Sequence, residues 1–253
     1  YAFEGCSSLT NITLPNSITI ISSYAFQGCS SLTTIVIPDS VKTIDIFAFN
    51  GCSSLTDITI PDSVNSIESF AFANCISLTT VTIPKNVTYL GSTAFLNCTG
   101  ITSITVDSNN TKYRHENNCI IEIETNTLKL VCNTNIIPDS VTSIGNSVFN
   151  ENTNAKSLTR PDNVTSIGPN AFYGCTSLVS ITLSNNLTSI GDYAFRNCCS
   201  LTSVTIPDGV TYIGNYAFYD CSNLKNVTIG NNVTSIGNYA FANCSNLTTI
   251  YFD

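Results

Sequence analysis

Nine cysteines recur at a fixed interval along the chain, and a regular array of thiols could bind a metal ion or form disulfides. They lie 23 residues apart in two series, Cys6, Cys29, Cys52, Cys75 and Cys98, then Cys175, Cys198, Cys221 and Cys244. A zinc site needs four ligands that converge on one point, but this spacing supplies one thiol per repeat, and the chain has a single histidine. Equivalent thiols in stacked repeats would have parallel Cβ directions, which a continuous series of disulfides cannot use. We therefore expect small buried core side chains, with no metal and no cofactor.

Cys119 and Cys132 do not follow this spacing and lie in a segment whose pattern predicts a β-hairpin. The stretch NNCIIEIETNTLKLVCN alternates apolar and polar residues on both sides of Thr125–Asn126. With the turn at that point, Glu122 faces Lys129, Cys119 faces Cys132, and the apolar residues share one face. This geometry allows a disulfide between Cys119 and Cys132. The alternative is two thiols on a buried face.

Candidate catalytic groups are few. His115 is the only histidine and lies in the polar stretch NNTKYRHENN. No nucleophile motif, paired-carboxylate pattern or glycine-rich phosphate loop stands in a fitting context, so we expect that the protein is not an enzyme. The region 107–132, which includes this stretch, carries a large share of the charges of the chain together with Tyr113 and Arg114, and aromatic residues and arginine dominate binding hot spots. We expect these two residues to contact a partner; the alternative is a structural island that only interrupts the repeats.

A 23-residue repeat explains how all these side chains are positioned. The unit reads A-F-x-x-C-x-x-L-x-x-I-x-I-P-x-x-V-x-x-I-G-x-x, with one longer step between Phe95 and Phe149. A fixed period of this length predicts a solenoid in which each coil contacts only its neighbours. In each coil, L-x-x-I-x-I predicts a first strand that proline ends. V-x-x-I predicts a short second strand, and A-F-x-x-C a turn or a single helical turn.

The repeat also predicts the domain organisation. We expect one β-rich solenoid domain over residues 1–253, with regular coils over 1–106 and 138–253 and an irregular island, built on the β-hairpin, over 107–137. The chain contains no methionine and begins within a repeat, so we expect it to be a piece of a longer protein.

The repeat unit, as in GCSSLTTIVIPDSVKTIDIFAF, resembles the BspA-like leucine-rich repeat, and the resemblance covers essentially the whole chain. It implies a curved, right-handed leucine-rich-repeat solenoid with a parallel sheet on its concave side. It also implies a cell-surface or secreted, adhesin-like protein that binds proteins or glycans of a host or a neighbouring cell. The segments 107–137 and 149–160 depart from the pattern, so the concave surface is least defined there.

The outward positions of the first strands form a regular polar array that is the expected partner-binding face. Its candidate residues are Thr59, Thr82, Ser103, Thr105, Thr159 and Thr182. Threonine ladders on a solenoid also raise the alternative of ice binding. A simpler explanation is that threonine is the polar residue best suited to strands.

Composition narrows the classes of partner. The net charge is −8, and nine Lys and Arg residues are spread along the chain, so we expect no nucleic-acid binding. No run approaches the roughly 18 apolar residues of a membrane span. We expect an extracellular or cell-surface location, with extracellular proteins or glycans as partners. Because repeat stacks need covered ends, end-to-end self-association of a structural scaffold is a further alternative.

Overall fold

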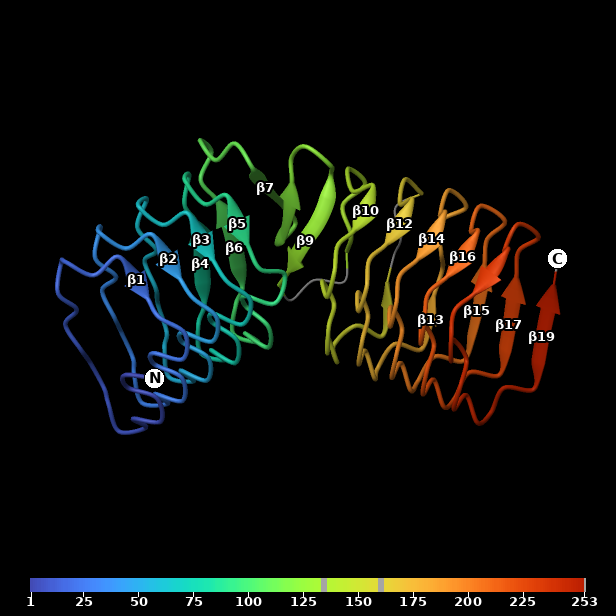
Figure 1. Cartoon of the computed structure of the whole chain (residues 1–253), viewed down its shortest axis with the longest axis horizontal. Helices are drawn as coiled ribbons and strands as arrows, with labels where there is room; N and C mark the ends of the chain where they lie inside the picture. Colours follow the sequence, from blue (N-terminus) through green and yellow to red (C-terminus); the bar gives the residue numbers. More distant parts are fainter. Residues whose placement is uncertain (133–135, 159–161, 253) are drawn as a thin grey trace. The chain divides into compact units, whose positions relative to one another are not determined.

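The computed structural model of the chain describes residues 1–132, 136–158 and 162–252. The chain forms two compact units, residues 1–124 and 125–253, and each is a stack of coils with parallel strands (Figure 1). Throughout the described residues the secondary structure consists of strands and turns, without helix. The solenoid of about 23 residues per coil is therefore confirmed, and each unit is described by itself.

In the first unit, the short second strands of successive coils form one parallel sheet. These strands are β1 (Ile20–Ile21), β2 (Thr43–Ile44), β3 (Ser66–Ile67) and β5 (Tyr89–Leu90). Each pairs with its equivalent one repeat later, as Ile21 does with Ile44. The first strands pair over four residues in β4 (Thr80–Ile83) and β6 (Ser103–Val106), and Val36 forms a bridge with Thr59.

The island begins with an antiparallel hairpin that the sequence pattern did not predict. In it, β7 (Tyr113–Glu116) pairs with β8 (Cys119–Glu122). The connecting residues Asn117 and Asn118 have φ values of 51° and 60°, as a two-residue type I′ turn requires. The sequence predicted a hairpin that turns at Thr125–Asn126. The structure has a strand on each side of this point, since β8 is followed by a turn that ends at Asn126 and then by β9 (Thr127–Val131).

The second unit repeats the same arrangement. Its parallel sheet of second strands contains β9, β10 (Ser143–Ile144), β12 (Ser166–Ile167), β14 (Ser189–Ile190), β16 (Tyr212–Ile213) and β18 (Ser235–Ile236). Its first strands form two further sheets, β11 (Ser157–Leu158) with β13 (Ser180–Ile181), and β15 (Ser203–Ile206) with β17 (Asn226–Ile229) and β19 (Thr249–Phe252). In β15 and β17 the alternating sequence places one set of side chains in the core and the other outside it.

Stacked phenylalanine rings run through the core of each unit. Rings from Phe3 to Phe95 stack one per coil at centroid distances of 5.1 to 5.3 Å, and rings from Phe149 to Phe241 at 4.9 to 5.1 Å. A second row of rings at the coil corner also stacks, as between Tyr193 and Tyr216. No coil could bury these rings alone, so stacking creates the core.

The A-F-x-x-C corner of each coil is a turn; of the two expected conformations, the helical one is not adopted. The reason is that alternate N–H groups donate to carbonyl groups of the next coil and not to carbonyl groups of their own turn, as they would in a helix. Phe26 N donates to Ala48 O (2.8 Å) and Gly28 N to Asn50 O (2.8 Å). Tyr24 and Gly28 have φ values of 60° and 71°. The corner therefore needs two left-handed residues, and glycine is the residue that adopts this conformation without cost.

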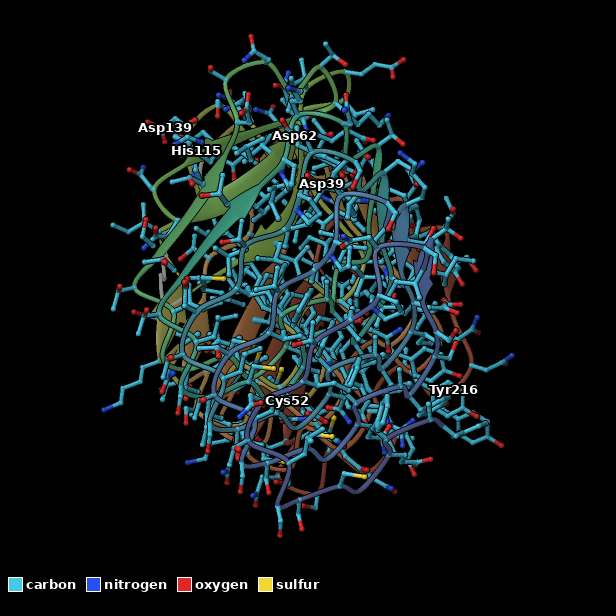
Figure 2. All side chains as sticks on the ribbon, turned by 90° about the vertical axis from the view of Figure 1, so that its left-hand side faces the viewer. Asp39, Cys52, Asp62, His115, Asp139 and Tyr216 are labelled. Atoms are coloured by element: carbon cyan, nitrogen blue, oxygen red, sulfur yellow. The ribbon has the colours of Figure 1, made fainter. Side chains whose placement is uncertain are left out.

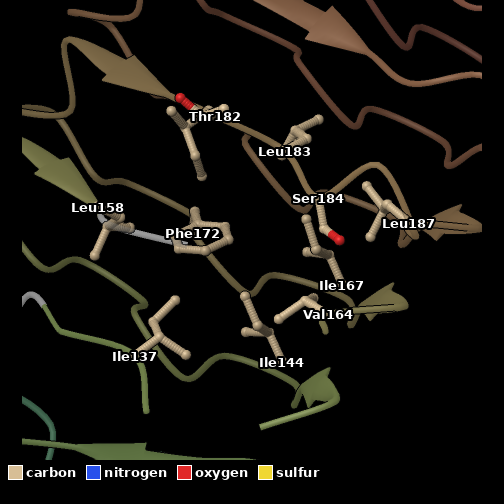
Figure 3. Close-up of a pocket in the computed structure, with 11 residues that line it drawn as sticks. Ile137, Ile144, Leu158, Val164, Ile167, Phe172, Thr182, Leu183, Ser184 and Leu187 are labelled. Atoms are coloured by element: carbon tan, nitrogen blue, oxygen red, sulfur yellow. The ribbon is translucent and has the colours of Figure 1, made fainter. Parts of the chain in front are cut away.

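A small apolar cavity of about 20 Å³ lies in the core of the second unit (Figure 3). Side chains of Leu158, Val164 and Phe172 are among those that line it. In the adjoining coil Ala155 stands where other coils have leucine, and Asn152 where they have cysteine. Asn152 Oδ1 accepts hydrogen bonds from the backbone N–H groups of residues 154 and 155. This coil departs from the repeat as expected, and the cavity is too small for a specific ligand.

Candidate functional site

The outward side chains of the first strands form a hydroxyl-rich surface in each unit, which we call the first-strand face. In the first unit it contains Thr59, Thr82, Ser103 and Thr105; the first two are exposed and the others half-buried. The Thr82 and Thr105 hydroxyl oxygens lie 3.0 Å apart and share a hydrogen bond. The sequence pattern thus placed these four residues on one surface, which presents mainly hydroxyl groups to solvent.

In the second unit the first-strand face contains a polar hollow of about 610 Å³. Its lining residues are Ser180, Ile181, Thr182, Leu183, Asn185, Ser203, Val204, Thr205, Pro207 and Asp208. The hollow lies where β13 and β15 are neighbours but belong to separate sheets of the described chain. Thr182, one of the predicted binding residues, is exposed in it. Thr159 was also predicted to bind a partner, but it lies outside the described residues.

Tyr113 was predicted to contact a partner, and the structure corrects this. Its side chain is only 4% exposed. The hydroxyl accepts a hydrogen bond from Leu90 N (3.2 Å) and donates one to Thr88 O (3.3 Å). Burial also raises the pKa of this phenol. Arg114 is half-buried and its Nη1 lies 3.0 Å from a carboxylate oxygen of Glu116, so a role for Arg114 at a partner surface stays a prediction.

The periodic cysteines are buried in the core from Cys29 onward, as predicted, whereas Cys6 in the first coil is exposed. Figure 2 shows Cys52 inside the coil stack. Each buried thiol also has a partner, because it donates a hydrogen bond to the phenylalanine carbonyl of the preceding coil. The Sγ–O distance is 3.2 Å from Cys52 to Phe26 and 3.0 Å from Cys175 to Phe149. The thiols therefore belong to the fold and are not presented to a substrate.

Burial keeps these thiols protonated. It raises the pKa of Cys52 and of Cys175 to about 12 and that of Cys244 to about 11. A thiolate is the form that attacks substrates and binds metals, so these groups are inert near neutral pH. Among the described residues, no cluster of three or more His, Cys, Asp or Glu side chains could hold a metal ion.

Cys119 and Cys132 are both buried. Burial raises the pKa of Cys119 to about 12. The disulfide between Cys119 and Cys132 stays a prediction.

Arg196 lies among tyrosine rings on the second unit, in a cluster that the sequence analysis did not single out. Its Cζ atom is 5.7 Å from the ring centroid of Tyr173, 5.8 Å from that of Tyr193 and 5.0 Å from that of Tyr219. Tyr173, Arg196 and Tyr219 are spaced by one repeat each, so aligning the coils at this position would have revealed the cluster. Tyr216, from the neighbouring row, projects outward in Figure 2. Such cation–π contacts stabilise by about 0.5–2 kcal/mol, and they fix this corner.

The family is decided by a match to the model of the BspA type leucine-rich repeat region, which covers residues 1–120 and 142–253. The chain belongs to this BspA-type family. The match leaves out residues 121–141, a range that includes the C-terminal part of the island. Within the described ranges, this BspA-type chain has no helix long and apolar enough to cross a membrane.

Three of the similar solved structures are of bacterial proteins. A leucine-rich cell surface protein from Faecalibacterium prausnitzii is 31% identical, with a TM-score of 0.77, over 100% of this chain and 75% of that one. A leucine-rich repeat protein from Bacteroides ovatus is 31% identical, with a TM-score of 0.62, over 99% of this chain and 57% of that one. The pneumococcal vaccine antigen PcpA is 25% identical, with a TM-score of 0.75, over 96% and 68%. No curated protein sequence matches the chain.

Proposed function

We propose that this chain is a non-enzymatic, cell-surface or secreted interaction module that binds extracellular proteins or glycans through its first-strand face. The observation that carries the proposal is the ordered, exposed hydroxyl array on that face, with a hollow of about 610 Å³ at Thr182. The similarity to a bacterial cell surface protein and a pneumococcal antigen supports the location. The buried, protonated thiols support a scaffold without catalytic chemistry.

The test is a binding screen of the full chain on arrays of extracellular matrix proteins and of glycans, followed by charge substitutions on the face. Thr82→Glu and Thr182→Glu introduce a carboxylate where we expect the partner to lie. Burying that charge at an interface is costly, so each should weaken binding at least about tenfold, equivalent to about 1.4 kcal/mol. Binding would be measured by surface plasmon resonance.

Matched controls come from the same coils. Thr88 and Thr188 are also exposed threonines, but they lie just before the second strands, away from the first-strand face. Thr88→Glu and Thr188→Glu should leave affinity unchanged. The proposal is wrong if no partner is found on either array, or if the control substitutions weaken binding as much as those on the face.

A further inference from the structure

The edge of the last regular coil of the first unit presents backbone groups that the next coil would normally bind. In the preceding coils such groups are paired along the stack: Lys42 O accepts the N–H of Asn65, and Thr79 O accepts that of Thr102. After β6 the chain does not form another regular coil. It enters the hairpin β7–β8, which packs against β6. Backbone groups left unpaired in a buried position would be costly.

Two island side chains satisfy the edge of the second-strand sheet. Asn110 is buried, and its Nδ2 donates to Pro84 O (2.7 Å) and Val87 O (3.1 Å). The Tyr113 hydroxyl accepts from Leu90 N and donates to Thr88 O. In the regular coils a serine makes the equivalent hydrogen bond to the coil before it. Ser63 Oγ, for example, donates to the Val41 carbonyl (2.7 Å).

Asn110 is itself fixed by the island. Its Oδ1 accepts the backbone N–H groups of Lys112 and Tyr113, both at 2.8 Å. The side-chain amide of Asn110 thus joins the start of β7 to the coil that contains Pro84 and Val87.

Two further side chains satisfy the edge of β6. Asn118 Oδ1 accepts from Ile104 N (3.3 Å), and its Nδ2 donates to Thr102 O (2.9 Å). His115 Nδ1 accepts from Val106 N (3.0 Å). An imidazole nitrogen accepts a hydrogen bond only when it carries no proton, so this last contact requires neutral His115.

We propose that residues 107–122 are an internal cap, in which the side chains of Asn110, Tyr113, His115 and Asn118 replace the hydrogen bonds of a missing coil and close the edge of the first repeat stack. A closed edge cannot accept a strand from another chain. The cap also gives the histidine of this chain a structural role, since its Nδ1 accepts the N–H of Val106.

The central test compares two glycine substitutions at adjacent residues of one turn. Asn118→Gly removes the amide that holds Ile104 N and Thr102 O, but it creates Asn-Gly, the preferred type I′ turn, so the hairpin is retained. Asn117→Gly makes the same change at the neighbouring exposed position. We expect Asn118→Gly to lower the hydrogen-exchange protection of the Ile104 amide roughly tenfold, and Asn117→Gly to leave it unchanged. Equal protection of Ile104 in both variants would overturn the proposal.

A second variant addresses the other edge. Tyr113→Phe keeps the buried ring and removes only the hydroxyl, so the Leu90 amide should lose protection while the Ile104 amide does not. If the protection of the Leu90 amide is unchanged, the Tyr113 hydroxyl does not cap the second-strand sheet, and the proposal is wrong for this edge.

A third variant compares two neighbouring amides of β6. Val106 N is held by His115 Nδ1, whereas Ile104 N is held by the amide of Asn118. His115→Leu removes the acceptor of Val106 N, so the protection factor of Val106 should fall relative to that of Ile104. An unchanged ratio would show that His115 does not hold this amide.

Discussion

At the scale of single residues, the core cysteines combine small size with a weak donor. The carbonyl of Phe26 accepts both the backbone N–H of Cys29 (3.1 Å) and the thiol of Cys52 (3.2 Å). Alanine would leave this second interaction unmade, and a larger side chain would not fit a close-packed core. Cysteine therefore suits the position because it behaves as a small apolar residue that can still donate.

These buried thiols predict a steep loss of stability at alkaline pH. The pKa of Cys52 and of Cys175 is raised to about 12 in the folded chain, whereas an unfolded cysteine titrates near about 8.5. The folded state thus keeps its protons while the unfolded state releases them. The free energy of unfolding is full below about pH 8.5 and falls as the pH rises toward 12, by about 1.4 kcal/mol per pH unit for each thiol. Urea unfolding measured at pH 7.5 to 10 should show this fall.

A cysteine substitution separates the thiols from tyrosine and lysine, which also titrate in this range. Cys52→Ala should lower stability at pH 7.5 and also make its decline with pH shallower by one thiol, about 1.4 kcal/mol per pH unit. Cys6→Ala removes an exposed thiol and should leave the decline unchanged. If Cys52→Ala and the unmodified chain show the same decline, burial of this thiol is not the cause.

At the scale of elements, the corner turn imposes a residue preference that only one coil violates. The position before the core cysteine has positive φ in every described coil that contains it. It is occupied by Gly5, Gly28, Gly51, Asn74, Asn97, Glu151, Gly174, Asn197, Asp220 and Asn243. Glycine, asparagine and aspartate tolerate this conformation, but a glutamate is strained in it. Glu151, with a φ of 55°, is therefore a local weak point.

Replacing this glutamate should stabilise the chain. Glu151→Gly removes the left-handed strain of about 1–2 kcal/mol but increases the freedom of the unfolded chain, so we expect a net gain of roughly 0.5–1 kcal/mol and a higher thermal midpoint in calorimetry. The reverse substitution one coil later, Gly174→Glu, should lower the midpoint, because Gly174 has a φ of 69°. If both substitutions lower the midpoint, the backbone conformation does not set the preference.

The sequence predicted those elements that repeat and missed contacts that do not. Phe26 and Cys29 could be placed in the core because their equivalents recur every 23 residues, and such a pattern has one stacked solution. Tyr113 was misplaced because the island has no equivalent coil to compare with, and an aromatic residue in a polar stretch looks exposed. The cap residues Asn118 and His115 could not be found, because the backbone groups that they bind exist only once the preceding coils are stacked.

At the scale of the whole molecule, the net charge is negative, but the proposed binding face consists mainly of uncharged hydroxyl side chains. The chain has a net charge of −8, yet only 10% of its residues are charged, and the first-strand face presents mainly threonine and serine. A partner on this face would be held by hydrogen bonds and buried area, while the net charge would act mainly on the rate of encounter. The proposed function therefore predicts a specific response to salt.

Affinity for a partner on the first-strand face should depend weakly on ionic strength. Raising NaCl from about 0.05 M to 0.5 M shortens the screening length to a few ångströms, which removes long-range attraction or repulsion but leaves short hydrogen bonds. We expect Kd to change less than about threefold, measured by titration calorimetry of the full chain. Thr82→Lys, which adds a charge to the face, should make Kd more dependent on salt than Thr88→Lys does. A loss of affinity of about a hundredfold in the unmodified chain would instead show that its scattered charges hold the partner, and would contradict the first-strand face as the binding site.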